Sequence, residues 1–127
     1  MVQKSPSSGA KGDFWTMTSR LLIIDEIIEL APVLEGMART IGRHSPELAA
    51  QIRRAWPRVA CNAGESLRRM GRKTTNRLDD AMGEAREVHT ALRYAAACGF
   101  VEGAEPVIDQ VDKVTATLYK LAHKPRA

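Results

Sequence analysis

The strongest constraint on the fold is a repeating pattern of apolar residues between Thr75 and Cys98. The apolar side chains recur in alternating steps of three and four, which places them on one face of an α-helix. They are Leu78, Ala81, Ala85, Val88, Leu92 and Ala95. Most of the stability of such a helix comes from packing of its apolar face, so other elements must cover it. Because this residue usage is typical of helical bundles, we predict an all-α protein.

A second long helix is predicted from Ser45 to Met70, and Gly71 ends it. Ser45 can accept hydrogen bonds from the first free backbone amides, Pro46 suits the first helical position, and Glu47 complements the helix dipole. Its apolar arc consists of Leu48, Ile52, Ala55, Val59, Ala63, Leu67 and Met70. The two long helices are therefore expected to form an antiparallel hairpin.

Two further helices complete the prediction. One should run from about Ser19 to Ile41, with a kink at Pro32, where the ring removes a backbone donor. Its expected apolar stripe is Ile24, Ile27, Ile28, Ala31, Leu34, Ala38 and Ile41. The other should begin near Pro106, with an apolar face of Val107, Val111, Val114, Leu118 and Leu121. Short connections between four helices predict an antiparallel up-down-up-down four-helix bundle.

The domain organisation follows from composition. The 127-residue chain is 44% hydrophobic but only 5% aromatic, so we expect one domain with an aliphatic core, over residues 19–124. Residues 1–18 are rich in Ser, Gly and Pro and are predicted to be a flexible tail. Within this tail, Phe14 and Trp15 could either dock loosely on the bundle or anchor a partner.

The sequence contains no run of apolar residues long enough to span a membrane and no disulfide framework, which limits the cellular location and the chemistry that we expect. The most apolar run, residues 21–24, is followed at once by Asp25 and Glu26 and is too short to span a bilayer. Two cysteines do not make a disulfide framework, and Cys61 is expected on an outer face. We therefore expect a cytoplasmic protein with no membrane association, no cofactor and no bound metal.

Basic residues dominate one part of the chain, which has a formal net charge of +4. The eight candidates for nucleic-acid contact are Arg53, Arg54, Arg58, Arg68, Arg69, Arg72, Lys73 and Arg77. An arginine-rich face suits phosphate groups, because guanidinium donates two parallel hydrogen bonds. A solvated helix face is the simpler alternative. In a third interpretation, this face pairs with the acidic face of Asp80, Glu84 and Glu87 on a neighbouring subunit and fixes the register of a ring.

Asn62 and Glu65 lie one turn apart, and Asn62 is expected at the level of Gly83 on the facing helix, where a missing side chain would let the helices approach closely. A ligand site at these two residues is the alternative. We interpret both polar residues as structural, making backbone or cross-helix hydrogen bonds. Glu84 and Glu87 could form a metal site with Glu102 and Glu105, but the second pair lies in a loop around Gly103. We therefore reject the metal site.

The ordered series of motifs in the central hairpin resembles the small "four helix bundle protein" family. These motifs are Gln51-Ile52-Arg53-Arg54-Ala55, Asn62-x-x-Glu65, Ala81-x-Gly83-x-Ala85-x-Glu87 and Leu92-x-x-Ala95-x-x-x-Gly99-Phe100. The match covers roughly residues 20–123. Two positions depart from the family pattern, since Ser66 stands where Gly is usual and Glu84 where Ser is common.

The family includes proteins encoded in 23S rRNA intervening sequences, and its wider relatives are the accessory (Avd-type) proteins of diversity-generating retroelements. The resemblance implies an all-α bundle, a ring-like homo-oligomer such as a pentamer, and no enzymatic activity. For the retroelement relatives it also implies binding to nucleic acid and to a reverse transcriptase. We therefore expect an oligomeric, RNA-binding bundle. The alternative is a scaffold module whose charges serve assembly alone.

Overall fold

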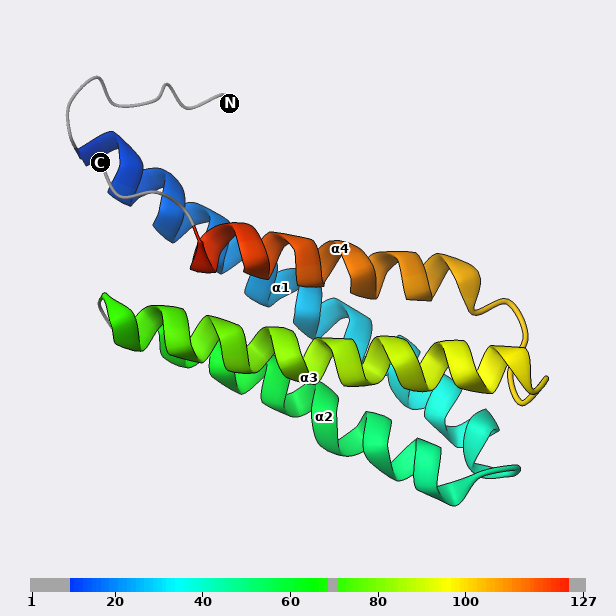
Figure 1. Ribbon diagram of the computed structural model, residues 1–127. Coiled ribbons are helices and arrows are strands. Elements are labelled where there is room, and N and C mark those ends of the chain that lie inside the picture. Colours follow the sequence, from blue (N-terminus) through cyan, green and yellow to red (C-terminus); the bar gives the residue numbers. More distant parts are fainter. Residues whose placement is uncertain (1–9, 69–70, 124–127) are drawn as a thin grey trace.

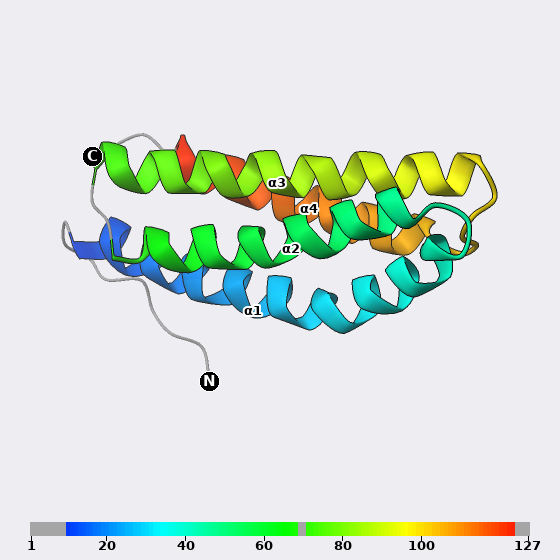
Figure 2. The same ribbon diagram turned by 90° about the horizontal axis from the view of Figure 1, so that it is seen from below.

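The structure, a computed structural model, describes residues 10–68 and 71–123, and within these ranges it contains four α-helices and no strand (Figure 1). The helices are α1 (Ala10–Gly42), α2 (Pro46–Ser66), α3 (Arg72–Ala97) and α4 (Glu105–Ala122). Consecutive helices run in opposite directions and pack as α1 on α2, α2 on α3 and α3 on α4 (Figure 1, Figure 2). The predicted all-α four-helix bundle is confirmed.

Helix α1 is longer than expected, because it begins at Ala10 and not at Ser19. Extending an existing helix costs little where no proline intervenes, and Gly12 alone does not stop it. The predicted flexible tail is therefore helical over residues 10–18, while residues 1–9 lie outside the described part. The same holds for the side chains of residues 10–20, including Phe14 and Trp15. The helix continues through Pro32 and follows a curved path (Figure 2).

The hairpin between α2 and α3 starts as predicted but turns earlier. The backbone N–H of Leu48 donates to the Ser45 Oγ at 3.3 Å, which caps α2. The helix ends at Ser66 and not at Met70, which lies outside the described residues. Gly71 then adopts a φ of 61° directly before α3, a conformation that glycine tolerates best. The early end of α2 changes which residues face each other across the hairpin.

The core confirms the predicted faces of α3 and α4 and corrects that of α1. All six members of the predicted α3 stripe are buried, as are four of the five predicted α4 residues; Leu121 is only partly buried. On α1, the buried positions include Ile23 and Leu30, whereas the expected Ile28 and Ala31 are exposed. Apolar residues surround much of α1, so its sequence is compatible with more than one buried face, and packing against α2 selects one.

The connection from α3 to α4 begins with a Schellman motif. Gly99 has a φ of +75°, its N–H donates to the Ala96 carbonyl at 3.1 Å, and the Phe100 N–H donates to the Ala95 carbonyl at 2.8 Å. These two bonds satisfy carbonyls that a helix end would otherwise leave free. The Phe100 ring stacks on His44 with 5.0 Å between ring centroids, which joins the two connections at this end of the bundle.

Candidate functional site

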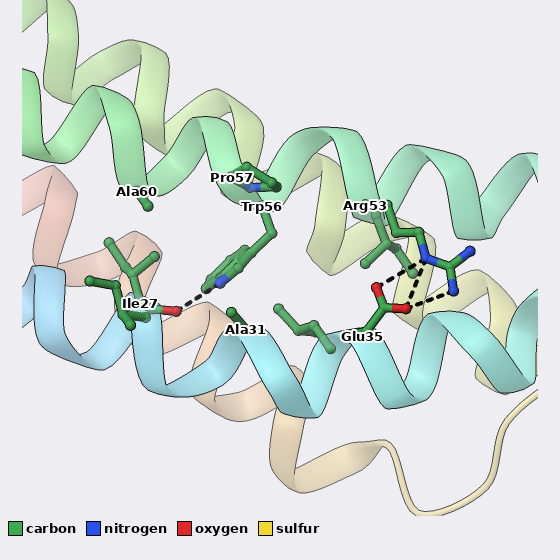
Figure 3. A pocket seen from close by; sticks show the side chains of 10 residues that line it. Ile27, Ala31, Glu35, Arg53, Trp56, Pro57 and Ala60 are labelled. Atoms are coloured by element: carbon green, nitrogen blue, oxygen red, sulfur yellow. Dashed lines mark hydrogen bonds and ion pairs between the residues drawn. The ribbon is translucent and has the colours of Figure 1, made fainter.

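The three predicted basic residues on α2 are exposed, and each pairs with a carboxylate of the same chain. Arg53 contacts Glu35 on α1 through three hydrogen bonds of 2.8–3.2 Å (Figure 3). These bonds lower the pKa of Glu35, helped by the charges of Arg53 and Arg39, and they raise the pKa of Arg53. The bidentate geometry uses the Nε and one Nη of Arg53 and fixes α1 against α2 at this level.

The other two arginines on α2 pair with α3. Arg54 lies 3.7 Å from Glu87, and Arg58 lies 3.8 Å from Glu84. The basic face of α2 and the acidic face of α3 therefore pair within one chain, along the seam between the two helices. This corrects the hypothesis that they meet across a subunit boundary, because the short turn brings the two faces together inside the hairpin.

A second group of basic residues surrounds the turn from α2 to α3. Arg68, Arg72 and Lys73 are exposed, and within the described ranges no carboxylate pairs with them. Arg77 is partly buried and donates to the Asn62 Oδ1 at 3.2 Å. Arg69 lies outside the described residues. The predicted set of eight is thus divided between the first half of α2 and the turn, with no single continuous stripe.

Two arginines that the sequence analysis did not select join the first group. Arg39, in the last turn of α1, and Arg43, in the connection just after it, line a depression of about 660 Å³ together with Arg53 and Arg54. Small residues form the rest of its lining, and a Cβ added at Gly42 would lie 3.3 Å from that of Ala49. We call this site the arginine corner. Both arginines could have been predicted to join this site, because a short connection must bring the end of α1 beside the start of α2.

The polar and glycine residues of the family motifs lie only partly where the sequence predicted. These residues are Asn62, Glu65, Gly83 and Glu87. Asn62 makes a cross-helix hydrogen bond as predicted, but its partner is Arg77 and it does not lie opposite Gly83. Gly83 is exposed, and an added Cβ would meet nothing within 4 Å, so it does not mark a close helix contact. Glu87 pairs with Arg54 across the seam, and Glu65 is partly buried on α2.

An apolar groove between α1 and α2 was not foreseen. It has a volume of about 430 Å³, and its lining includes Ile28, Ala31, Trp56 and Pro57 (Figure 3). Trp56 is only 3% exposed, and its indole N–H donates to the Ile27 carbonyl at 2.8 Å. A buried tryptophan needs such a partner for its N–H. Both Ile28 and Ala31 belong to the stripe that the sequence predicted to be buried.

No family model, curated protein or solved structure matches the chain. Three statements therefore stay predictions from the sequence motifs: membership of the four helix bundle family, assembly into pentamers and binding to a reverse transcriptase.

Within the described ranges, no group of three or more His, Cys, Asp or Glu side chains is placed to hold a metal ion. Cys61 and Cys98 are both exposed free thiols. No helix in the described part of the chain is long and apolar enough to cross a membrane.

Proposed function

We propose that this protein is a cytoplasmic, non-enzymatic helical-bundle module that binds structured RNA through its basic surface. The observation that carries the proposal is the arginine corner, where guanidinium groups from two helices surround one depression. Arginines converging from separate elements can contact several phosphate oxygens at once, and each contact releases counterions from the nucleic acid. The basic turn at Arg68, Arg72 and Lys73 offers a second contact at the other end of α2.

The ion pairs at the corner are compatible with this role. The Arg39, Arg53 and Glu35 side chains are all about half exposed or more. Exposed ion pairs contribute little to stability because water screens them, so a phosphate group can compete with a carboxylate for the same guanidinium. Arg43 has no carboxylate partner in the described part of the structure and is available directly.

The experiment is a titration of the full chain with a structured RNA at several salt concentrations. We expect a linear fall of log affinity with log salt, and a slope that is smaller by about 2 in the Arg39→Ala/Arg43→Ala variant. Lys113→Ala is the matched control, because Lys113 is an exposed cation on α4, away from both basic groups. Undetectable binding, or an equal loss in the control, would overturn the proposal.

A second candidate function is self-association, in which the protein serves as a scaffold. The observation that favours it is that six large apolar side chains are exposed in the described ranges and four of them are on α1. These four are Leu21, Leu22, Ile28 and Val33. Contiguous exposed apolar surface is typical of protein interaction sites. Sedimentation velocity over a range of protein concentrations should reveal a species larger than 14.0 kDa, and a single monomeric species throughout would rule this candidate out.

If RNA is the ligand, a nucleoprotein partner such as a reverse transcriptase is the partner that the motif resemblance suggests. Co-purification of the two proteins should then require RNA, because the proposed contact surface is basic. Nuclease treatment that leaves the complex intact would argue against an RNA-mediated contact.

A further inference from the structure

The exposed face of α1 carries acidic residues between two pairs of apolar side chains, with Leu21 and Ile28 on one side of the acids and Leu22 and Val33 on the other. Leu21 and Ile28 are 52% and 55% exposed, and at about 100° per residue they fall on one side of the helix. Asp25 and Glu29 are exposed and follow at 40–100° around the helix from these two positions. Within the described residues neither carboxylate has an ion-pair partner. We call these four residues the acid-edged face, which borders the apolar groove.

A second copy docked on this face by two-fold symmetry would be disfavoured. In an antiparallel two-fold contact the same edge of both helices lies on the same side, so the carboxylates of Asp25 and Glu29 would meet those of the other copy. A parallel two-fold contact centred on this face would likewise place the carboxylates beside those of the other copy or bury them without a counter-ion. The occupant must therefore present basic residues beside an apolar group.

The chain itself carries a surface of this kind, on the C-terminal half of α3. Tyr94 is 59% exposed, and Arg86, Thr90 and Arg93 are exposed on adjoining positions of the same helix. Both arginines lie about 80–100° to one side of Tyr94, at 100° per residue. We call these four residues the α3 ridge. It borders a shallow hollow of about 340 Å³ between α2 and α3.

The charges around the α3 ridge leave it positive. The nearest carboxylates on α3 are those of Glu84 and Glu87, and these pair with Arg58 and Arg54. No carboxylate in the described ranges pairs with Arg86 or Arg93, and the one described contact of the Arg86 guanidinium is to the Met82 sulfur at 3.4 Å. On the α3 ridge, an apolar side chain thus lies beside a row of basic residues. On the acid-edged face, a row of apolar residues lies beside a row of acidic residues.

We propose that the acid-edged face of one copy binds the α3 ridge of a second copy. The Tyr94 ring would pack on Leu21 and Ile28, and the arginines of the ridge would pair with Asp25 and Glu29. The two surfaces lie on different helices, so the contact is head-to-tail, and each copy keeps one surface to bind the next. The complementary charges fix the register and exclude the two-fold contact. This inference rests on the proposed self-association and names its two surfaces.

The test uses charge reversal in the full chain, followed by sedimentation velocity. Arg93→Glu and Glu29→Arg should each raise the protein concentration at which half of the chains are assembled, by about tenfold or more. The double variant should return this concentration to near the wild-type value, because it restores a pair of opposite charges. Lys113→Glu and Asp112→Arg on α4 make the same charge changes at exposed positions outside both surfaces and should leave assembly unchanged.

The outcomes separate this inference from self-association as such. Assembly that persists unchanged in both single variants would overturn the pairing of these surfaces and leave self-association standing. Single variants that dissociate without recovery in the double variant would also overturn the pairing. A wild-type chain that stays monomeric would overturn both. Far-ultraviolet circular dichroism of every variant should match the wild type, since all these positions are exposed.

Discussion

Trp56 is the residue that joins α1 to α2 most directly. Its ring is buried, and its N–H donates to the Ile27 carbonyl on α1. Trp56→Phe should lower the free energy of unfolding by about 1–2 kcal/mol, because it removes one hydrogen bond and part of the buried ring. Trp56→Ala should cost about 3–5 kcal/mol, through the cavity that it creates.

Urea unfolding followed by circular dichroism measures both values. Tyr119→Phe is a suitable control, since Tyr119 is half exposed on α4 and its substitution should change stability little. A Trp56→Phe variant as stable as the wild type would mean that the hydrogen bond to Ile27 adds nothing to the contact between α1 and α2.

The Glu35–Arg53 pair predicts that the stability of the protein depends on pH. Hydrogen bonds from Arg53 lower the pKa of Glu35 below its ordinary value of 4.5, so the folded state holds this carboxylate ionised in more acidic solution. The contribution of the pair to stability is thus present above the ordinary carboxyl pKa and is lost as the pH falls through the lowered value. Carboxyl NMR titration should show the pKa of Glu35 rising toward its ordinary value in Arg53→Ala. An identical titration in both proteins would contradict the pairing.

At the scale of the helix, Gly83 within α3 and Gly99 just past its end should respond oppositely to alanine. Gly83 lies within the helix, is exposed, and has open space where a Cβ would be. Gly83→Ala should therefore stabilise the protein by about 0.5–1 kcal/mol, through the better helix propensity of alanine. Gly99, just past the helix end, has a φ of +75°, so Gly99→Ala should destabilise by about 1–2 kcal/mol. Thermal unfolding of the two variants against wild type measures the difference, and a loss of stability in Gly83→Ala would revive the close helix contact first expected there.

The helices also differ in how well their sequences predicted their packing. The face of α3 could be predicted because its Leu and Val residues all fall on one stripe and most exposed positions of the helix are polar. On α1, Ile23 and Ile24 are neighbours, as are Ile27 and Ile28, so periodicity alone permits two buried faces. Packing on α2, where Trp56 bonds to Ile27, decides between them and leaves Ile28 to line the groove. The groove therefore could not be predicted from the pattern of one helix.

The predicted basic residues are divided into two groups for a related reason. Counting along the chain found a stripe, but ion pairing and the turn depend on contacts between helices. Glu84 and Glu87 pair with two of its arginines across the seam between α2 and α3. Arg39 and Arg43 were missed because they belong to another helix and join the site only through the short connection before Ser45.

For the whole molecule, the two basic groups lie at opposite ends of α2. Arg54 and Arg68 are fourteen residues apart, which corresponds to about 21 Å along a helix. One long RNA can contact both groups, and residues this far apart make no contact with each other in the protein, so their contributions to binding are independent. We therefore expect the losses of binding free energy in Arg39→Ala/Arg43→Ala and Arg68→Ala/Arg72→Ala to add, within about 0.5 kcal/mol, in the quadruple variant. Fluorescence anisotropy with one structured RNA at constant salt measures all three losses. If the quadruple variant loses no more binding free energy than the double variant with the larger loss, the two groups do not hold the same RNA. The bundle then binds through one end only.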